Sequence, residues 1–226
     1  MKINALGNSV PTLLDYLSTD TSDESISALL QQNAANNLEA LRTKLGLTDS
    51  SSATATYDKI LTASENTVDL LKDLVSTDQD SLFAKAAESK DTTEVVSSIT
   101  NLVASYNSMV TSMSSVGGTA NITYLAELGK AFVDNEDALK AVGITRNDNG
   151  TLTIDAEKLQ AASLDDLKAL FNDEADYVNQ LGTNIVEISN VALQSSLMSA
   201  RYSNAYGSDG TTTTNSLLNS LYNSQA

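Results

Sequence analysis

The 226-residue chain carries 13 lysines and arginines against 29 aspartates and glutamates, which gives a formal net charge of −16. It contains no histidine, cysteine or tryptophan and a single proline. These absences exclude disulfides, cysteine nucleophiles, Cys/His zinc sites and histidine acid–base catalysis. The acidic balance disfavours binding to nucleic acids or anionic membranes, because both require clustered lysine and arginine.

The apolar content is low for a compact domain. Hydrophobic residues make up 41% of the chain and aromatic residues 5%. This composition disfavours a thick core and favours thin apolar seams between paired helices. No apolar run approaches the roughly 20 residues of a membrane-spanning helix, so we expect no membrane insertion. Residues 1–25 contain one lysine and no apolar core, so we expect no cleaved secretory signal.

The sequence predicts four regions. Residues 1–21, rich in Asn, Ser, Thr and Asp, predict a disordered N-terminal segment. Residues 22–116 predict a helical region that contains a hairpin of two long helices. Residues 117–206 predict a second helical region with a small β-hairpin. Residues 207–226 predict a flexible tail that begins GSDGTTTT and ends in a short amphipathic piece.

Helical spacing of apolar residues begins after Asp23 and predicts a first helix that ends near Gly46. Its stripe consists of Ile26, Leu30, Ala34, Leu38, Leu41 and Leu45. Two longer stripes then show the alternating steps of a coiled-coil seam. They are Tyr57, Leu61, Ser64, Val68, Leu71 and Val75, and Val95, Ile99, Leu102, Tyr106, Met109 and Met113. A short helix around Phe83 separates them, so we expect an antiparallel hairpin.

The pair Gly117-Gly118 interrupts this pattern, and a different arrangement follows. The next helix should end near Gly143 with one apolar side, formed by Ile122, Leu125, Leu128, Phe132 and Leu139. Residues 144–154 flank an Asn/Asp/Gly turn with short alternating runs and predict a β-hairpin. The expected fold class is therefore mainly α, with long antiparallel helices forming a coiled coil or helix bundle and one small β-hairpin.

Short helices and one long helix complete the expected order. Asp155 and Ser163 should each cap a short helix. The last long helix should start near Asn172, where Asp173 and Glu174 suit the positive end of the helix dipole. Its seam runs through Val178, Leu181, Ile185, Ile188 and Ala192, and then weakens to Ser195, Ser199 and Tyr202.

No motif predicts catalysis, a metal site or a cofactor. The turn at residues 147–150 resembles part of a calcium-binding loop, but the first and twelfth positions would be Thr145 and Ala156. Both lack the required carboxylate, so a simple turn is favoured. The acidic pairs at residues 165–166 and 173–174 lie near expected helix starts, where capping and the helix dipole explain them. We therefore predict a protein that is not an enzyme and needs no cofactor.

Several blocks carry a family resemblance. GITRNDNGTLTIDAEKL at residues 143–159, followed by LKALF at residues 167–171, resembles the C-terminal region of the bacterial flagellar filament cap protein, also called flagellar hook-associated protein 2. ITNLVASYNSMV at residues 99–110 is similar to that family's helix with Leu-Val-x-x-Tyr-Asn. The resemblance covers roughly residues 91–206, and the family's N-terminal block and variable middle domains have no counterpart.

The resemblance implies an exported structural protein of the bacterial flagellum, involved in cell motility. Its partners would be flagellin, hook-junction proteins, further copies of the chain and a cytosolic flagellar export chaperone. Its location would be extracellular, after passage of the unfolded chain through the flagellar type III apparatus. A filament cap acts mechanically, by holding a cavity at the filament tip where arriving flagellin folds.

The apolar seams can close within one chain or between chains. Packing within the chain is favoured for residues 57–75 and 95–113. The candidate assembly seam consists of Val178, Leu181, Ile185, Ile188, Ala192, Tyr202, Leu217, Leu218, Leu221 and Tyr222. Its last four residues favour a partner, because a linker separates them from the remaining chain.

Two other functions compete with a flagellar role. The chain could be an extracellular helical adhesin or interaction module that shares only the coiled-coil character. A hydrolase that uses carboxylates alone is disfavoured, because no acidic pair meets the geometric requirement for a catalytic base.

Overall fold

The computed structural model describes residues 38, 42–43, 47 and 52–206. The chain divides into two units, Met1–Thr48 and Asp49–Ala226. In the first unit, the side chains of Leu38, Arg42 and Leu47 are buried. The predicted disordered segment, most of the predicted first helix and the tail lie outside the described residues.

The second unit is mainly helical and contains one two-stranded sheet, which confirms the predicted fold class. Its elements are α4 (Ser52–Val75), α5 (Leu82–Ser89), α6 (Thr93–Val116), α7 (Thr119–Asp134), α8 (Glu136–Ala141), β1 (Ile144–Arg146), β2 (Leu152–Ile154), α9 (Ala156–Ala161), α10 (Leu164–Phe171) and α11 (Asp176–Tyr206). Within the described part of the chain, no helix combines the length and the apolar character needed to cross a membrane.

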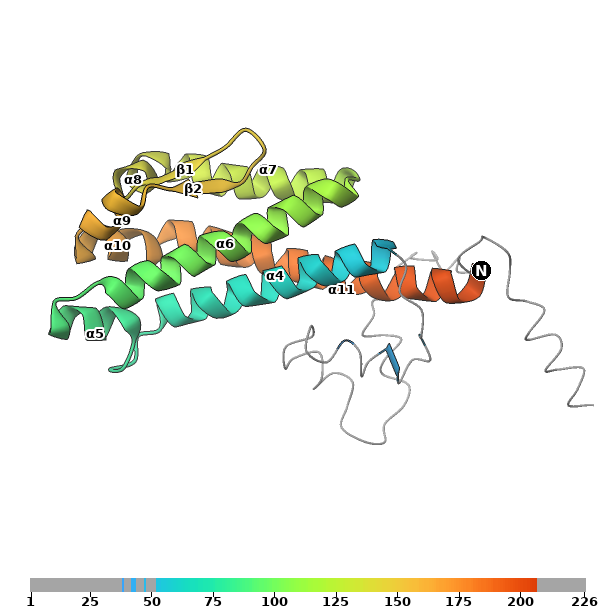
Figure 1. Cartoon of the computed structure of the whole chain (residues 1–226), viewed down its shortest axis with the longest axis horizontal. Coiled ribbons are helices and arrows are strands. Elements are labelled where there is room, and N and C mark those ends of the chain that lie inside the picture. The colour runs from blue at the N-terminus through green and yellow to red at the C-terminus, as the bar shows by residue number, and fades with distance from the viewer. Residues whose placement is uncertain (1–37, 39–41, 44–46, 48–51, 207–226) are drawn as a thin grey trace, which may run out of the picture. The chain divides into compact units, whose positions relative to one another are not determined.

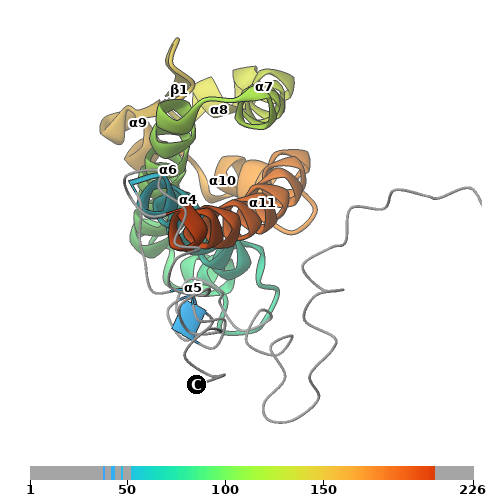
Figure 2. The ribbon, with the colours of Figure 1, turned by 90° about the vertical axis from the view of Figure 1, so that its right-hand side faces the viewer.

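Four long helices form an antiparallel bundle (Figure 1). Helix α4 packs along α6 on one side and along α11 on the other, and α7 contacts both α6 and α11. Seen along the bundle, α6 lies beside α4, and α7 lies beside α11 (Figure 2). Helix α5 connects α4 to α6, whereas α8, the hairpin, α9 and α10 connect α7 to α11.

The predicted pairing of residues 57–75 with residues 95–113 is confirmed by the packing of α4 against α6. Every predicted seam residue of α6, from Val95 to Met113, is buried. On α4 the prediction holds only in part, because Leu61, Ser64 and Leu71 are buried while the other three are half-buried. Since α4 faces two helices, it also buries a second set of residues: Thr54, Ile60, Ala63, Thr67 and Leu74.

The predicted single helix between Gly118 and Gly143 is interrupted. Helix α7 ends at Asp134, and α8 begins after Asn135, whose amide side chain donates to the carbonyl of Ala131 at 3.0 Å. Leu128, Phe132 and Leu139 are buried as expected.

The placement of Ile122 on the buried side of this helix was wrong, because its side chain is 64% exposed. Near its start, α7 instead buries Asn121, whose side chain donates to the carbonyl of Gly117 at 2.7 Å. The polar neighbour of Ile122 therefore takes the inward position.

The predicted hairpin is confirmed, with Ile144 opposite Ile154 and Arg146 opposite Leu152. Gly143 starts it with φ +87°. A Cβ atom there would lie 2.8 Å from the backbone oxygen of Asp155, so glycine suits both the conformation and the close approach.

Helix caps follow the predicted positions. The carboxylate of Asp155 accepts from the backbone N–H of Lys158 at 3.2 Å, and the hydroxyl of Ser163 accepts from that of Asp166 at 3.1 Å. The last helix starts later than predicted, at Asp176 rather than near Asn172. Residues 172–175 form the turn between α10 and α11, in which the N–H of Ala175 donates to the carbonyl of Asn172.

Candidate assembly surface

The candidate assembly residues fall into three groups. Five are buried within the bundle: Val178, Leu181, Ile185, Ile188 and Ala192. Tyr202 is 67% exposed. Leu217, Leu218, Leu221 and Tyr222 lie outside the described residues. Among the six described candidates, Tyr202 is thus the one whose side chain lies mostly at the surface.

The buried seam of α11 continues further than the sequence indicated. The hydroxyl of Ser196, on α11, donates to the carboxylate of Asp58, on α4, at 2.6 Å. Leu193, Leu197 and Ala200 are also buried. The predicted line followed Ser195 and Ser199 and therefore missed these residues. In a straight α-helix, residues at seven-residue spacing drift slowly around the helix axis, so the positions that face the bundle change along α11.

Helix α11 also has a second, outward line, of which the sequence prediction included Ser195 and Tyr202 but missed Val191 and Met198. Val191, Ser195, Met198 and Tyr202 follow one another in steps of four, three and four residues. Val191 and Ser195 are half-buried, whereas Met198 and Tyr202 are 66% and 67% exposed. The regular spacing of these four residues could have predicted the line. The sequence alone, however, does not separate them from the apolar residues of the buried face of the same helix.

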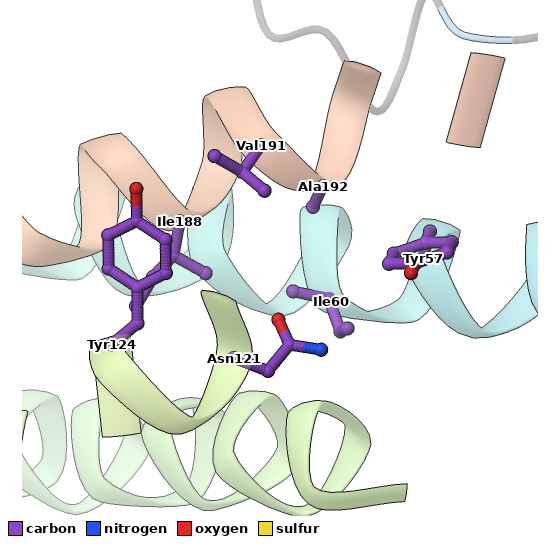
Figure 3. A pocket seen from close by; sticks show the side chains of 7 residues that line it. All are labelled: Tyr57, Ile60, Asn121, Tyr124, Ile188, Val191 and Ala192. Atoms are coloured by element: carbon purple, nitrogen blue, oxygen red, sulfur yellow. The ribbon is translucent and has the colours of Figure 1, made fainter. Parts of the chain in front are cut away.

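The outward line begins at a recess between α4, α7 and α11 (Figure 3). Tyr57, Ile60, Asn121, Tyr124, Ile188, Val191 and Ala192 line it. About 10 Å³ of this recess is open to the centre of a water molecule, which is room for about one water. The recess is thus too small for an organic ligand, and it marks the place where α7 stops covering α11.

A separate set of polar contacts fixes the hairpin to α6. The side chain of Asn107 donates to the carbonyl of Leu152 at 2.8 Å and accepts from its N–H at 2.7 Å. The hydroxyl of Tyr106 donates to the carbonyl of Gly150 at 3.2 Å. Two consecutive side chains of α6 therefore satisfy the backbone of β2 and of the turn before it. We call these contacts the hairpin clamp.

Arg146 of β1 lies near two residues of the hairpin clamp, Tyr106 and Gly150. A Cβ atom on Gly129 of α7 would lie 3.1 Å from its guanidinium, so the glycine allows Arg146 to cross α7 closely. Burial raises the pKa of the Tyr106 hydroxyl to about 12, and the positive charge of Arg146 partly offsets that rise. Burial, together with the nearby Tyr106, also raises the pKa of Tyr177, whose ring meets Phe171 edge-on at 5.9 Å.

The groups considered for metal binding have local structural roles. In the turn at residues 147–150, the amide of Asn147 donates to the hydroxyls of Thr151 and Thr153 at 2.9 and 3.0 Å. Asp165 and Asp166 lie in the first turn of α10. Among the residues that the structure describes, no group of three or more acidic side chains has a geometry able to hold a metal ion.

Comparison with known proteins finds no matching family model, no similar curated protein and no similar solved structure. The function must therefore be inferred from the residues of this chain and their contacts.

Proposed function

We propose that this protein is an exported structural subunit of the bacterial flagellum, similar to the filament cap. It acts through helix-mediated self-association and through contact with flagellin or hook-junction subunits. It has no enzymatic role. It reaches the cell exterior unfolded, through the flagellar type III apparatus, and a cytosolic export chaperone holds it before transport.

The hairpin clamp is the observation that carries this proposal. Two of the three blocks that resemble the cap family are the helix segment with Tyr106-Asn107 and the segment from Gly143 that contains Gly150-Thr151-Leu152. Side chains of the first block bond directly to the backbone of the second. The residues that carry the resemblance thus lie together in one structural unit, which supports treating the two blocks as a single motif.

The composition of the core suits a chain that is exported unfolded. Thr54, Ser64, Thr67 and Ser196 are fully buried within the bundle. The hydroxyls of Ser64 and Thr67 donate to carbonyls four residues earlier, at 2.7 and 2.6 Å. Each such position contributes less apolar burial than a valine or leucine would, so the bundle remains easier to unfold.

Electron microscopy of a deletion strain of the source bacterium tests the proposal. Without a tip structure, secreted flagellin should be lost to the medium, so we expect short or missing filaments and soluble flagellin in the culture supernatant. The intact gene, supplied on a plasmid, should restore the filaments.

Filaments of normal length that stay attached in the deletion strain would refute a capping role. If that strain instead lost attachment to surfaces while its filaments remained normal, the adhesin hypothesis would replace the flagellar one. Both measurements use the same strain and the same complementing plasmid, so the two functions are compared directly.

A further inference from the structure

We infer that the outer side of α7, where the guanidinium of Arg146 lies between Ile122 and Val133, binds an exposed carboxylate of a second copy of this chain. The inference rests on the proposed function, because that function requires copies of the chain to associate. It deepens that function by naming the contact surface and the chemistry that its partner surface must carry. We call Ile122, Val133 and Arg146 the α7 docking face.

The guanidinium of Arg146 occupies the place of a side chain on α7. A Cβ atom on Gly129 would lie 3.1 Å from Nη2 of Arg146 and 3.3 Å from its Cζ atom. A Cβ atom on Gly150 would lie 3.5 Å from the same Nη2, and the hydroxyl of Tyr106 is also close to the guanidinium. Arg146 is nevertheless exposed. A guanidinium that three elements already hold in place loses less side-chain entropy when it binds a partner.

Two exposed apolar side chains flank this guanidinium along α7. Ile122, Gly129 and Val133 are separated by seven and by four residues, so they lie on the same side of the helix. Ile122 is 64% exposed and Val133 is 61% exposed. Because Arg146 lies on Gly129, Ile122 is about two turns away on one side of it and Val133 about one turn away on the other. An arginine among apolar neighbours that exclude water is the composition of a strong protein–protein contact.

Arg146 lacks an acidic partner within the described part of its own chain. Lys72, Lys130, Lys140 and Lys158 each form an ion pair with a carboxylate three or four residues away, whereas no described carboxylate pairs with Arg146. A guanidinium presents its five N–H donors in a planar fork that matches the two oxygens of a carboxylate. The α7 docking face therefore has the chemistry to bind an aspartate or a glutamate.

A second copy of the chain can supply that carboxylate. The chain has 29 acidic residues against 13 basic ones. Exposed acids such as Glu157, Asp165 and Glu187 form no ion pair with any residue that the structure describes. Copies that each carry −16 repel one another, so a stable contact between them needs opposite charges at the point of contact. Arg146 provides the positive charge, which favours a second copy as the occupant.

The contact joins two different surfaces. Arg146 of one copy repels Arg146 of another, so the α7 docking face must meet a different, acidic surface of its neighbour. Such a heterologous contact repeats from copy to copy, and it either closes into a ring or continues as an open chain. It therefore does not stop at the dimer.

Sedimentation of the purified full chain, at one fixed ionic strength, tests the α7 docking face. We expect the unchanged chain to associate as its concentration rises. Arg146→Glu and Ile122→Ser should each weaken this association at least about tenfold. Lys85→Glu is the matched control, because it makes the same change of charge at an exposed lysine of α5, and it should leave the association nearly unchanged.

A mixing experiment tests the heterologous character of the contact. A copy with Arg146→Glu keeps its acidic surface, so it can still bind the docking face of an unchanged copy. The variant, carrying a fluorescent label at its N-terminus, should sediment as a monomer alone and as part of a larger complex in excess unchanged chain. A variant that stays monomeric in that excess contradicts a heterologous contact.

Three other results overturn the inference. They are an unchanged chain that stays monomeric at every concentration, an effect of Lys85→Glu equal to that of Arg146→Glu, and an Ile122→Ser variant that associates normally. Circular dichroism should show equal helix content in all variants. If Arg146→Glu lost helix content, Ile122→Ser would replace it in both measurements, because Ile122 is exposed. The deletion strain tests the flagellar role and sedimentation tests the contact, so failure of the one is distinguished from failure of the other.

Discussion

At the scale of single residues, polar side chains determine how the short elements attach to the bundle. Asn107 is half-buried on α6 and pairs with both backbone groups of Leu152. When a backbone N–H and a carbonyl inside a protein lose such partners, the folded state is destabilised, because water reaches these groups poorly and does not replace the lost hydrogen bonds. One amide side chain therefore satisfies both backbone groups of Leu152.

Asn107→Ala should lower the free energy of unfolding by about 1–3 kcal/mol, because two hydrogen bonds are lost and Leu152 keeps unsatisfied groups. Urea unfolding followed by circular dichroism measures this change. Asn101→Ala, at an exposed position of the same helix, is the matched control and should change stability by less than about 0.5 kcal/mol. Equal effects of the two substitutions would show that the hairpin clamp adds nothing.

Tyr106 and Tyr177 predict a loss of stability at alkaline pH. An unfolded tyrosine loses its proton near pH 10.0, whereas folded Tyr106 keeps its proton up to about pH 12. Its stabilising contribution is therefore complete below pH 10 and lost as the pH rises toward 12. The free energy of unfolding should fall by about 1.4 kcal/mol per pH unit for each such tyrosine.

Urea unfolding at a series of pH values across this window measures that slope. Tyr106→Phe should make it shallower, because phenylalanine does not titrate. The same slope in both proteins would contradict an origin in the buried hydroxyl.

At the scale of elements, the number of neighbouring helices determines how much of each helix is buried. Helix α4 lies between α6 and α11 and therefore buries more than one seam. Helix α7 has fewer contacts and leaves Ile122 and Val133 exposed. A heptad pattern predicts the direction of one contact well, but it does not show that a helix has two neighbours.

Ile185→Asp should unfold the bundle, since Ile185 is fully buried and a carboxylate there would have neither water nor a partner. We expect a loss above about 4 kcal/mol, seen as reduced helical circular dichroism. Val186→Asp, one residue further along and 47% exposed, is the control and should preserve the helix. If Ile185→Asp kept both its circular dichroism and its sedimentation unchanged, the seam would be misplaced.

At the scale of the whole molecule, the excess of acidic groups opposes compactness. Ion pairs such as Lys72–Asp69, Lys130–Asp134 and Lys140–Glu136 join exposed neighbours three or four residues apart. Pairs of this kind add little stability. Holding a net charge of −16 on a folded chain of this size therefore costs free energy through self-repulsion.

Added sodium chloride should raise the thermal unfolding midpoint, because screening weakens this repulsion more in the compact state than in the extended one. Differential scanning calorimetry at low and at physiological ionic strength measures the change. The largest part of the rise should come at low ionic strength, where the screening length changes most. A midpoint that stays constant or falls with salt would contradict this expectation.

The sequence by itself determined the mainly helical class, the helix hairpin, the β-hairpin at residues 144–154 and both short-helix caps. Those features depend on contacts between near neighbours or on the regular spacing of one seam. Only the tertiary structure decided that Val178, Leu181 and Ile185 pack inside the bundle, because a seam looks the same whether its partner is its own chain or another. The acidic excess that disfavours nucleic-acid partners is also unevenly placed, since residues 188–206 of α11 contain no acidic residue.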